Sequence, residues 1–155
     1  MQVTGEKGIG SILKVILQVC FWGGIATLVL IPIILLIMGE HIGGAFIYVL
    51  CPNGIAMLVI VKQFIGLFDS LKENKPFSNN TVKRLKKASI ASLVMAILFV
   101  IQTIYEFFLV KADIVFCIGL GFLVVLFFGV SIALYILSEL FRQANEYKSE
   151  NDLTI

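Results

Sequence analysis

The stretch LFDSLKENKPFSNNTVKRLKKAS, residues 67–89, decides the fold, because it places a cluster of basic residues between two long apolar runs. Pro76 cannot continue a helix that enters from the run before it. Ser78 is a typical N-cap residue and predicts the start of a second helix. We therefore predict a helical hairpin over residues 69–87 that projects from the apolar part of the protein and carries a basic face.

Apolar runs make up most of the remaining chain. Of its 155 residues, 59% are hydrophobic and 14% are charged, whereas soluble proteins carry about 25% charged residues. The four runs cover residues 12–38, 45–68, 88–109 and 114–137. Each is long enough to cross a hydrocarbon core of about 30 Å as a helix, and in lipid only a helix satisfies the backbone within its own segment. The sequence predicts an all-α integral membrane four-helix bundle, with residues 1–155 as one domain.

The basic residues predict how these spans are oriented. Eleven of the twelve Lys and Arg residues fall on one side of the predicted spans, and Lys111 alone falls on the other. Because basic residues mark the cytoplasmic side, an even number of spans places both termini and the hairpin in the cytoplasm. We expect a multi-pass protein of the cell membrane whose outer loops, residues 39–44 and 110–113, are short.

Beyond residue 137 the sequence predicts an amphipathic C-terminal tail, residues 138–155, that continues the last helix. Its apolar residues recur at spacings of three and four: Leu137, Leu140, Phe141, Ala144 and Tyr147. We expect this stripe to pack on the helical extension of the second span. The closing residues ENDLTI, 150–155, break the pattern, and we expect them to dock on this protein or on a partner.

Polar residues within predicted spans are candidate functional sites. Asn53 belongs to CPNG, residues 51–54, where a proline and a glycine predict a kink and leave a ligand pocket as the alternative. Lys62 lies near the cytoplasmic end of the second span, where its side chain can reach the head groups. Glu106 lies near the outer end of the third span, where a cation or proton could bind. Small residues with the spacing of close helix contacts are Gly23 with Thr27 and Gly129 with Ala133.

Motifs for catalysis or metal binding are absent from the sequence. It contains no phosphate loop and no zinc motif, and its one histidine, His41, lies in a predicted outer turn. Cys20, Cys51 and Cys117 are isolated in apolar runs, which is typical of small buried hydrophobic residues. We expect no enzyme activity, no cofactor and no metal.

Two segments together resemble a known family. They are KPFSNNTVKRLKK at residues 75–87 and ENDLTI at residues 150–155. With its four predicted spans, the chain resembles the small bacterial membrane proteins grouped as domain of unknown function 2975. Members share a Pro-Phe pair and a hydroxyl residue before the third span and often close with Asp-Leu-Thr and a β-branched residue. The matching residues here are Pro76, Phe77, Ser78, Asp152, Leu153, Thr154 and Ile155.

The resemblance implies a cytoplasmic partner, because genes of this family commonly stand beside one for a small helix-turn-helix regulator. It suggests a sensory or regulatory membrane protein whose hairpin and tail engage that regulator through the matched residues and Arg84. The basic residues of the hairpin are also expected to attract anionic membrane lipids, and we expect no direct binding of nucleic acid. The alternatives are an immunity or small-molecule or ion transport protein that acts through the bundle, and a lipid-binding scaffold that forms homo-oligomers.

Overall fold

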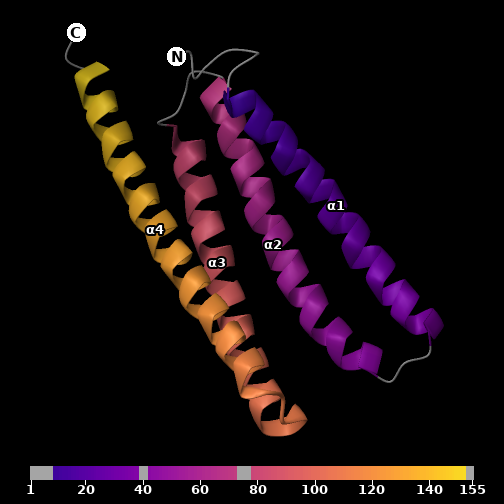
Figure 1. Cartoon of the computed structure of the whole chain (residues 1–155). Helices are drawn as coiled ribbons and strands as arrows, with labels where there is room; N and C mark the ends of the chain where they lie inside the picture. The colour runs from indigo at the N-terminus through magenta and orange to yellow at the C-terminus, as the bar shows by residue number, and fades with distance from the viewer. Residues whose placement is uncertain (1–8, 39–41, 73–77, 153–155) are drawn as a thin grey trace.

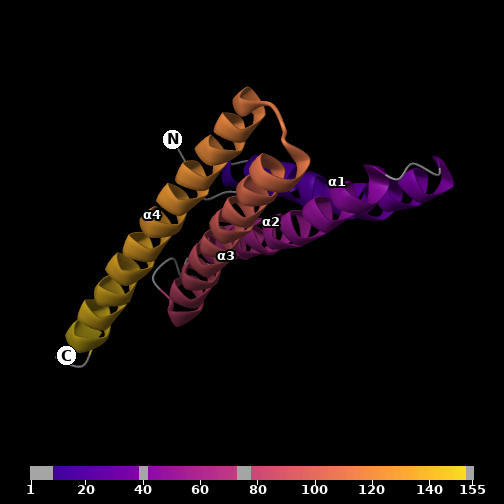
Figure 2. The same ribbon diagram turned by 90° about the horizontal axis from the view of Figure 1, so that it is seen from below.

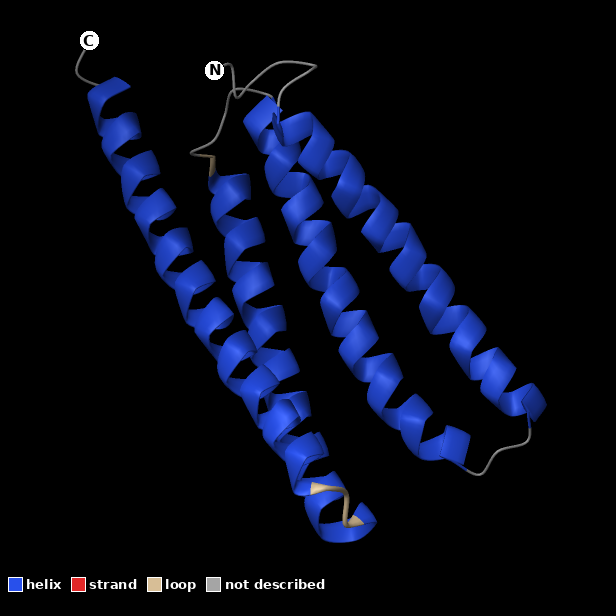
Figure 3. Ribbon diagram, viewed as in Figure 1, coloured by secondary structure: helices blue, strands red, loops and turns tan. Residues whose placement is uncertain are grey.

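The computed structural model describes residues 9–38, 42–72 and 78–152 of the chain (Figure 1). These residues form four long helices: α1 (Ile9–Met38), α2 (Ile42–Lys72), α3 (Asn79–Tyr105) and α4 (Ile114–Asp152). A π-helical turn, η1 (Glu106–Val110), follows α3 directly. All secondary structure in the described ranges is helical (Figure 3), which confirms the all-α prediction.

All four helices are long and apolar enough to cross a membrane, so the chain has the architecture of a multi-pass membrane protein. The helices also extend beyond the predicted spans. α2 continues to Lys72, α3 begins at Asn79, and α4 continues to Asp152. At about 1.5 Å per residue, the part of α4 after residue 137 adds about 22 Å to its length. The predicted hairpin and tail are therefore largely continuations of the spanning helices.

The helices pack in the order of the chain, as an open row of antiparallel neighbours. α1 contacts α2, α2 contacts α3 and α3 contacts α4, while no contact among the described residues joins α1 to α4. Figures 1 and 2 show an α1–α2 pair and an α3–α4 pair that diverge toward the α1–α2 and α3–α4 connections. At the opposite end, α1 begins, α2 ends, α3 begins and α4 ends (Figure 1). We call this the basic end, because it holds Lys14, Lys83, Arg84, Lys86 and Lys87.

α3 and α4 bury matching stripes whose residues are spaced three and four apart. On α3 the stripe contains Thr81, Leu85, Ala88, Ser92 and Met95, of which Met95 also packs with Ala56 and Ile60 of α2. On α4 it contains Cys117, Leu120, Ser131, Leu134 and Ser138. This seven-residue repeat lets side chains of one helix fit between those of the other, as in a left-handed coiled coil. Because about half of these residues are small, the two backbones can approach closely along the interface.

The predicted apolar stripe of the tail differs from the stripe that is buried. Phe141 packs on the buried cluster at the start of α3, but Leu140 is 55% exposed and Tyr147 is 68% exposed. Ser138 is buried instead, and its Oγ donates a hydrogen bond to the carbonyl oxygen of Tyr135, 2.8 Å away. The tail packs chiefly along α3 rather than on the extension of α2 as expected, and its one link to that extension is the buried cluster on which Phe141 and Leu67 both pack.

Two glycines set the contact between α1 and α2. A Cβ added at Gly54 would overlap Cδ2 of Leu28 and lie 3.0 Å from its Cγ. A Cβ added at Gly24 would lie 3.0 Å from Cδ2 of Leu58. By contrast, Gly23 and Gly129, which were expected at helix contacts, have nothing within 4 Å of an added Cβ, so that expectation was wrong. The glycine of the CPNG segment thus makes room for a neighbouring helix.

Candidate functional site

The first turn of α3 confirms the predicted N-cap. Ser78 has an extended backbone (φ −95°, ψ 153°), and its Oγ accepts a hydrogen bond from the backbone N–H of Thr81 at 3.2 Å. Its carbonyl oxygen accepts from the N–H of Val82, also at 3.2 Å. The next residue, Asn79, accepts through Oδ1 from Nδ2 of Asn145 at 2.9 Å. The start of the hairpin's second helix is therefore tied to the extension of α4.

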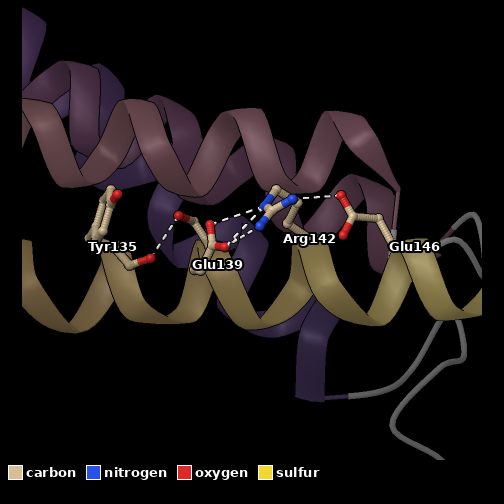
Figure 4. A network of polar contacts seen from close by, with 5 residues as sticks. Tyr135, Glu139, Arg142 and Glu146 are labelled. Carbon is tan, nitrogen blue, oxygen red and sulfur yellow. Dashed lines mark hydrogen bonds and ion pairs between the residues drawn. The ribbon is translucent and has the colours of Figure 1, made fainter.

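A charged network lies on the exposed side of that extension (Figure 4). Arg142 donates from Nε to both carboxylate oxygens of Glu139, at 3.1 Å each, and its Nη2 pairs with the same group. Its Nη1 donates to Glu146 at 2.6 Å. Exposed ion pairs of this kind contribute little to stability, because water and salt screen them. One arginine thus forms ion pairs with two acidic side chains at the basic end.

Arg84 lies between α2 and α3, whereas Asn79, next to the Ser78 cap, contacts Asn145 of α4. A Cβ added at Gly66 would overlap Nη1 and Cζ of Arg84 and lie 2.9 Å from its Nε, so the guanidinium occupies the space that this glycine leaves open. Ser70, one turn later on α2, donates to the carbonyl oxygen of Gly66 at 3.2 Å. Two of the predicted docking residues, Ser78 and Arg84, therefore belong to different surfaces of the hairpin.

The other predicted docking residues cannot be compared in the same way. Pro76, Phe77, Leu153, Thr154 and Ile155 lie outside the described residues. Asp152 is the last residue of α4, and its side chain is outside the described part. Docking of these residues on the protein or on a partner stays a prediction.

The three predicted polar residues of the spans lie in separate places. Asn53 is half-buried on α2 beside Gly54, where α1 approaches. Lys62 is exposed on α2, about 13 Å along the helix from Asn53 at 1.5 Å per residue. Glu106 is half-buried at the start of the π-turn that ends the third span. The described part of the chain shows no contact that joins the three and no group of His, Cys, Asp or Glu that could hold a metal ion.

An ion pair between α1 and α2 was missed by the sequence reasoning. Lys14 near the start of α1 binds Asp69 near the end of α2, and the side chains are 22% and 46% exposed. The pair links the first helix to the hairpin at the basic end. The only signal in the sequence was that both residues stand at the same edge of their apolar runs.

Serines that join α3 and α4 were also missed. Ser89 Oγ donates to the carbonyl oxygen of Ser131 at 2.9 Å, and Ser131 Oγ donates to that of Ser89 at the same distance. Both residues are buried. Ser92, one turn from Ser89, is fully buried, and its Oγ has no hydrogen-bond partner in the described structure. Hydroxyl groups recurring on one face of two apolar runs were the signal that could have found this interface.

The fold and these contacts define a helical multi-pass membrane protein whose polar interactions gather at one end. The family model described as "Protein of unknown function (DUF2975)" matches residues 11–155, and the chain belongs to this family. This confirms the resemblance found in the sequence. A search of the curated proteins and a search of the solved structures found no match to the chain.

Proposed function

We propose that the chain is a non-enzymatic sensory or regulatory protein of the bacterial cell membrane, with both termini in the cytoplasm. Its hairpin and C-terminal segment would engage a small helix-turn-helix transcriptional regulator. Eleven of the twelve basic residues fall on one side of the predicted spans, and the positive-inside rule assigns such a side to the cytoplasm. A regulator in the cytoplasm would then meet the hairpin and the extension of α4 together.

The observation that carries the proposal is the outward face of α4 beyond its apolar run. Leu140 and Tyr147 are 55% and 68% exposed, although Phe141 on the same helix packs on α3. The two exposed residues are seven positions apart and so lie on one side of the helix, two turns from each other. Apolar anchors at this spacing are what a hydrophobic groove of a partner protein recognises in an amphipathic helix.

The test is recovery of the regulator with the tagged full-length chain from membranes, together with transcription from a promoter that the regulator controls. Tyr147→Ala is expected to lower recovery at least about tenfold, since burying a large apolar side chain is worth about 1.5–3 kcal/mol. Tyr135→Ala is the matched control, because Tyr135 is a 54% exposed tyrosine within the apolar run of the same helix. Unchanged recovery and transcription with Tyr147→Ala, and with a chain that ends at residue 149, would contradict the proposal.

A transport or immunity role acting through the bundle is the second candidate, and buried polar atoms of α3 favour it. Ser92 Oγ and Gln102 Oε1 are buried with no hydrogen-bond partner in the described structure, and Glu106 follows Gln102 by one turn. If these groups bind a cation or a small molecule, Glu106→Gln should alter sensitivity to a membrane-active compound, while the chain ending at residue 149 should not. The homo-oligomeric lipid-binding scaffold stays a prediction that the mass of the purified protein would test.

A further inference from the structure

Arg84 places a charge between two helices, and no acidic side chain of the described residues pairs with it. Its guanidinium fills the space over Gly66, and its Nε is buried and has no hydrogen-bond partner. No ion pair to Arg84 forms among the described residues. This position therefore holds the positive charge of a guanidinium, which is partly removed from water and has no counter-charge among the described side chains. Such a charge is costly unless an anion meets it.

The acidic side chains described at the basic end are already engaged. Asp69 binds Lys14, while Glu139 and Glu146 bind Arg142. The other described acidic side chains, those of Glu106 and Asp113, lie at the opposite end of the molecule. An anion for Arg84 therefore has to come from outside the described part of the chain.

The depth of Arg84 indicates what that anion is. Arg84 lies one turn before Ala88, where the apolar run of α3 begins, and so stands at the level of lipid head groups. Lys87 follows it by one turn of α3, and Lys62 precedes Gly66 by one turn of α2, so both lysines adjoin the same junction. Both are exposed, and neither forms an ion pair within the described ranges.

We propose that Arg84, seated over Gly66, binds the phosphate of an anionic lipid head group, with Lys62 and Lys87 as flanking charges. Phosphate oxygens match the planar fork of a guanidinium, which can donate two parallel hydrogen bonds. A lipid supplies the phosphate rather than a free ion, because Arg84 lies one turn before the apolar run of α3. This proposal does not rest on regulator docking, although Arg84 was also predicted as a docking residue. It also differs from general attraction between basic residues and lipid, because it depends on the position of the guanidinium over Gly66.

The experiment uses the full-length protein in detergent, offered equal amounts of phosphatidylglycerol and phosphatidylcholine. Native mass spectrometry measures which lipid is retained, and thermal unfolding measures the stabilisation by each. Four variants are compared with the natural chain, the fourth being Arg84→Lys. Arg84→Gln removes the guanidinium proposed to bind the phosphate, and Lys86→Gln removes an equal charge at an exposed position nearby. Gly66→Ala leaves the charge intact while displacing the guanidinium.

The natural chain is expected to retain phosphatidylglycerol selectively. Arg84→Gln and Gly66→Ala should each lower that selectivity about tenfold, as expected for lost hydrogen bonds to a charged group, whereas Lys86→Gln should leave it nearly unchanged. Arg84→Lys keeps the charge without the planar fork, and its lipid selectivity should fall between those of the natural chain and Arg84→Gln. An intermediate selectivity separates loss of the contact to phosphate from a folding defect.

Three results would overturn the proposal. The first is no preference for phosphatidylglycerol in the natural chain. The second is equal losses for Arg84→Gln and Lys86→Gln with no effect of Gly66→Ala, which would mean general surface charge. The third is stabilisation by inorganic phosphate in phosphatidylcholine that equals the effect of phosphatidylglycerol, which would mean a free-ion site.

Discussion

Replacing Gly54 with alanine tests the contact between α1 and α2 most directly. The added Cβ would overlap Cδ2 of Leu28 and lie 3.0 Å from Cγ and 3.1 Å from Cδ1. Carbon atoms in contact are ordinarily about 3.5–4.0 Å apart. Leu28 would therefore have to leave its rotamer, or the two helices would have to separate.

The expected change in the free energy of unfolding has two parts of opposite sign. Overpacking costs about 1–3 kcal/mol, whereas replacing a helical glycine with alanine returns about 1 kcal/mol. Gly54→Ala should therefore destabilise the natural chain by about 1 kcal/mol. In a Leu28→Ala background the obstructing atoms are gone, so the same substitution should stabilise by about 1 kcal/mol. The sign of the effect should reverse.

The assay is reversible unfolding of the full-length protein in mixed micelles with increasing dodecyl sulfate, followed by circular dichroism. Gly23→Ala is the control, because nothing lies within 4 Å of its added Cβ. It should stabilise by about 1 kcal/mol in both backgrounds. If Gly54→Ala has the same sign in both backgrounds, Leu28 does not occupy the space that Gly54 provides, and the reasoning is refuted.

Three further predictions use the same unfolding assay. Ser89→Ala and Ser131→Ala should each lose about 0.6 kcal/mol, because each hydroxyl donates to the other residue's backbone; the two Oγ atoms are also 3.4 Å apart, so the losses should couple by at least about 0.5 kcal/mol, and strict additivity would contradict this. Lys111→Gly should gain about 1 kcal/mol, because Lys111 has a left-handed backbone (φ 55°); a loss of stability would be the contrary result. Ser78→Ala should cost about 1 kcal/mol through loss of the N-cap, and Ser78→Asp should retain most of the stability; equal losses in both would argue against capping.

The helices were predictable because their signals are local. The length of a spanning helix can be read from its own apolar run. The limits of the hairpin are likewise set by residues within the hairpin. Ser78 caps α3 through atoms only three and four residues away. α2 ends at Lys72, before Pro76, as the proline predicts. Such features need no knowledge of where the other helices lie.

The contacts between helices were not predictable in the same way. α1 is apolar on all sides, so its sequence does not indicate which side meets a neighbour. Gly24 approaches α2 and Gly23 does not, although they are adjacent and differ by one 100° step around the helix. The tail was misjudged for the same reason, since Leu140 lies outside and the polar Ser138 lies inside.

The polar contacts of the basic end depend on those helix positions and were missed with them. Lys14 and Asp69 are 55 residues apart in the chain, and they meet only because α1 and α2 are antiparallel partners. Arg84 was recognised as a basic residue of the hairpin, but its position depends on Gly66, which carries no signal in isolation. The sequence thus identified where charge gathers but not which groups are paired and which remain open.

The open row of helices has a consequence for how the protein assembles during synthesis. Every helix packs on the one made immediately before it, so α2 can dock on α1 while α3 is still being translated. Among the described residues, the backbone contacts that wait for the last helix are those of α4 with α3 and η1, together with the side chains Phe127 and Leu134 that complete clusters shared with α2. The chain can therefore complete its structure one helix at a time from its N-terminal end, and a product halted after α3 would still contain two of the three interfaces between its long helices.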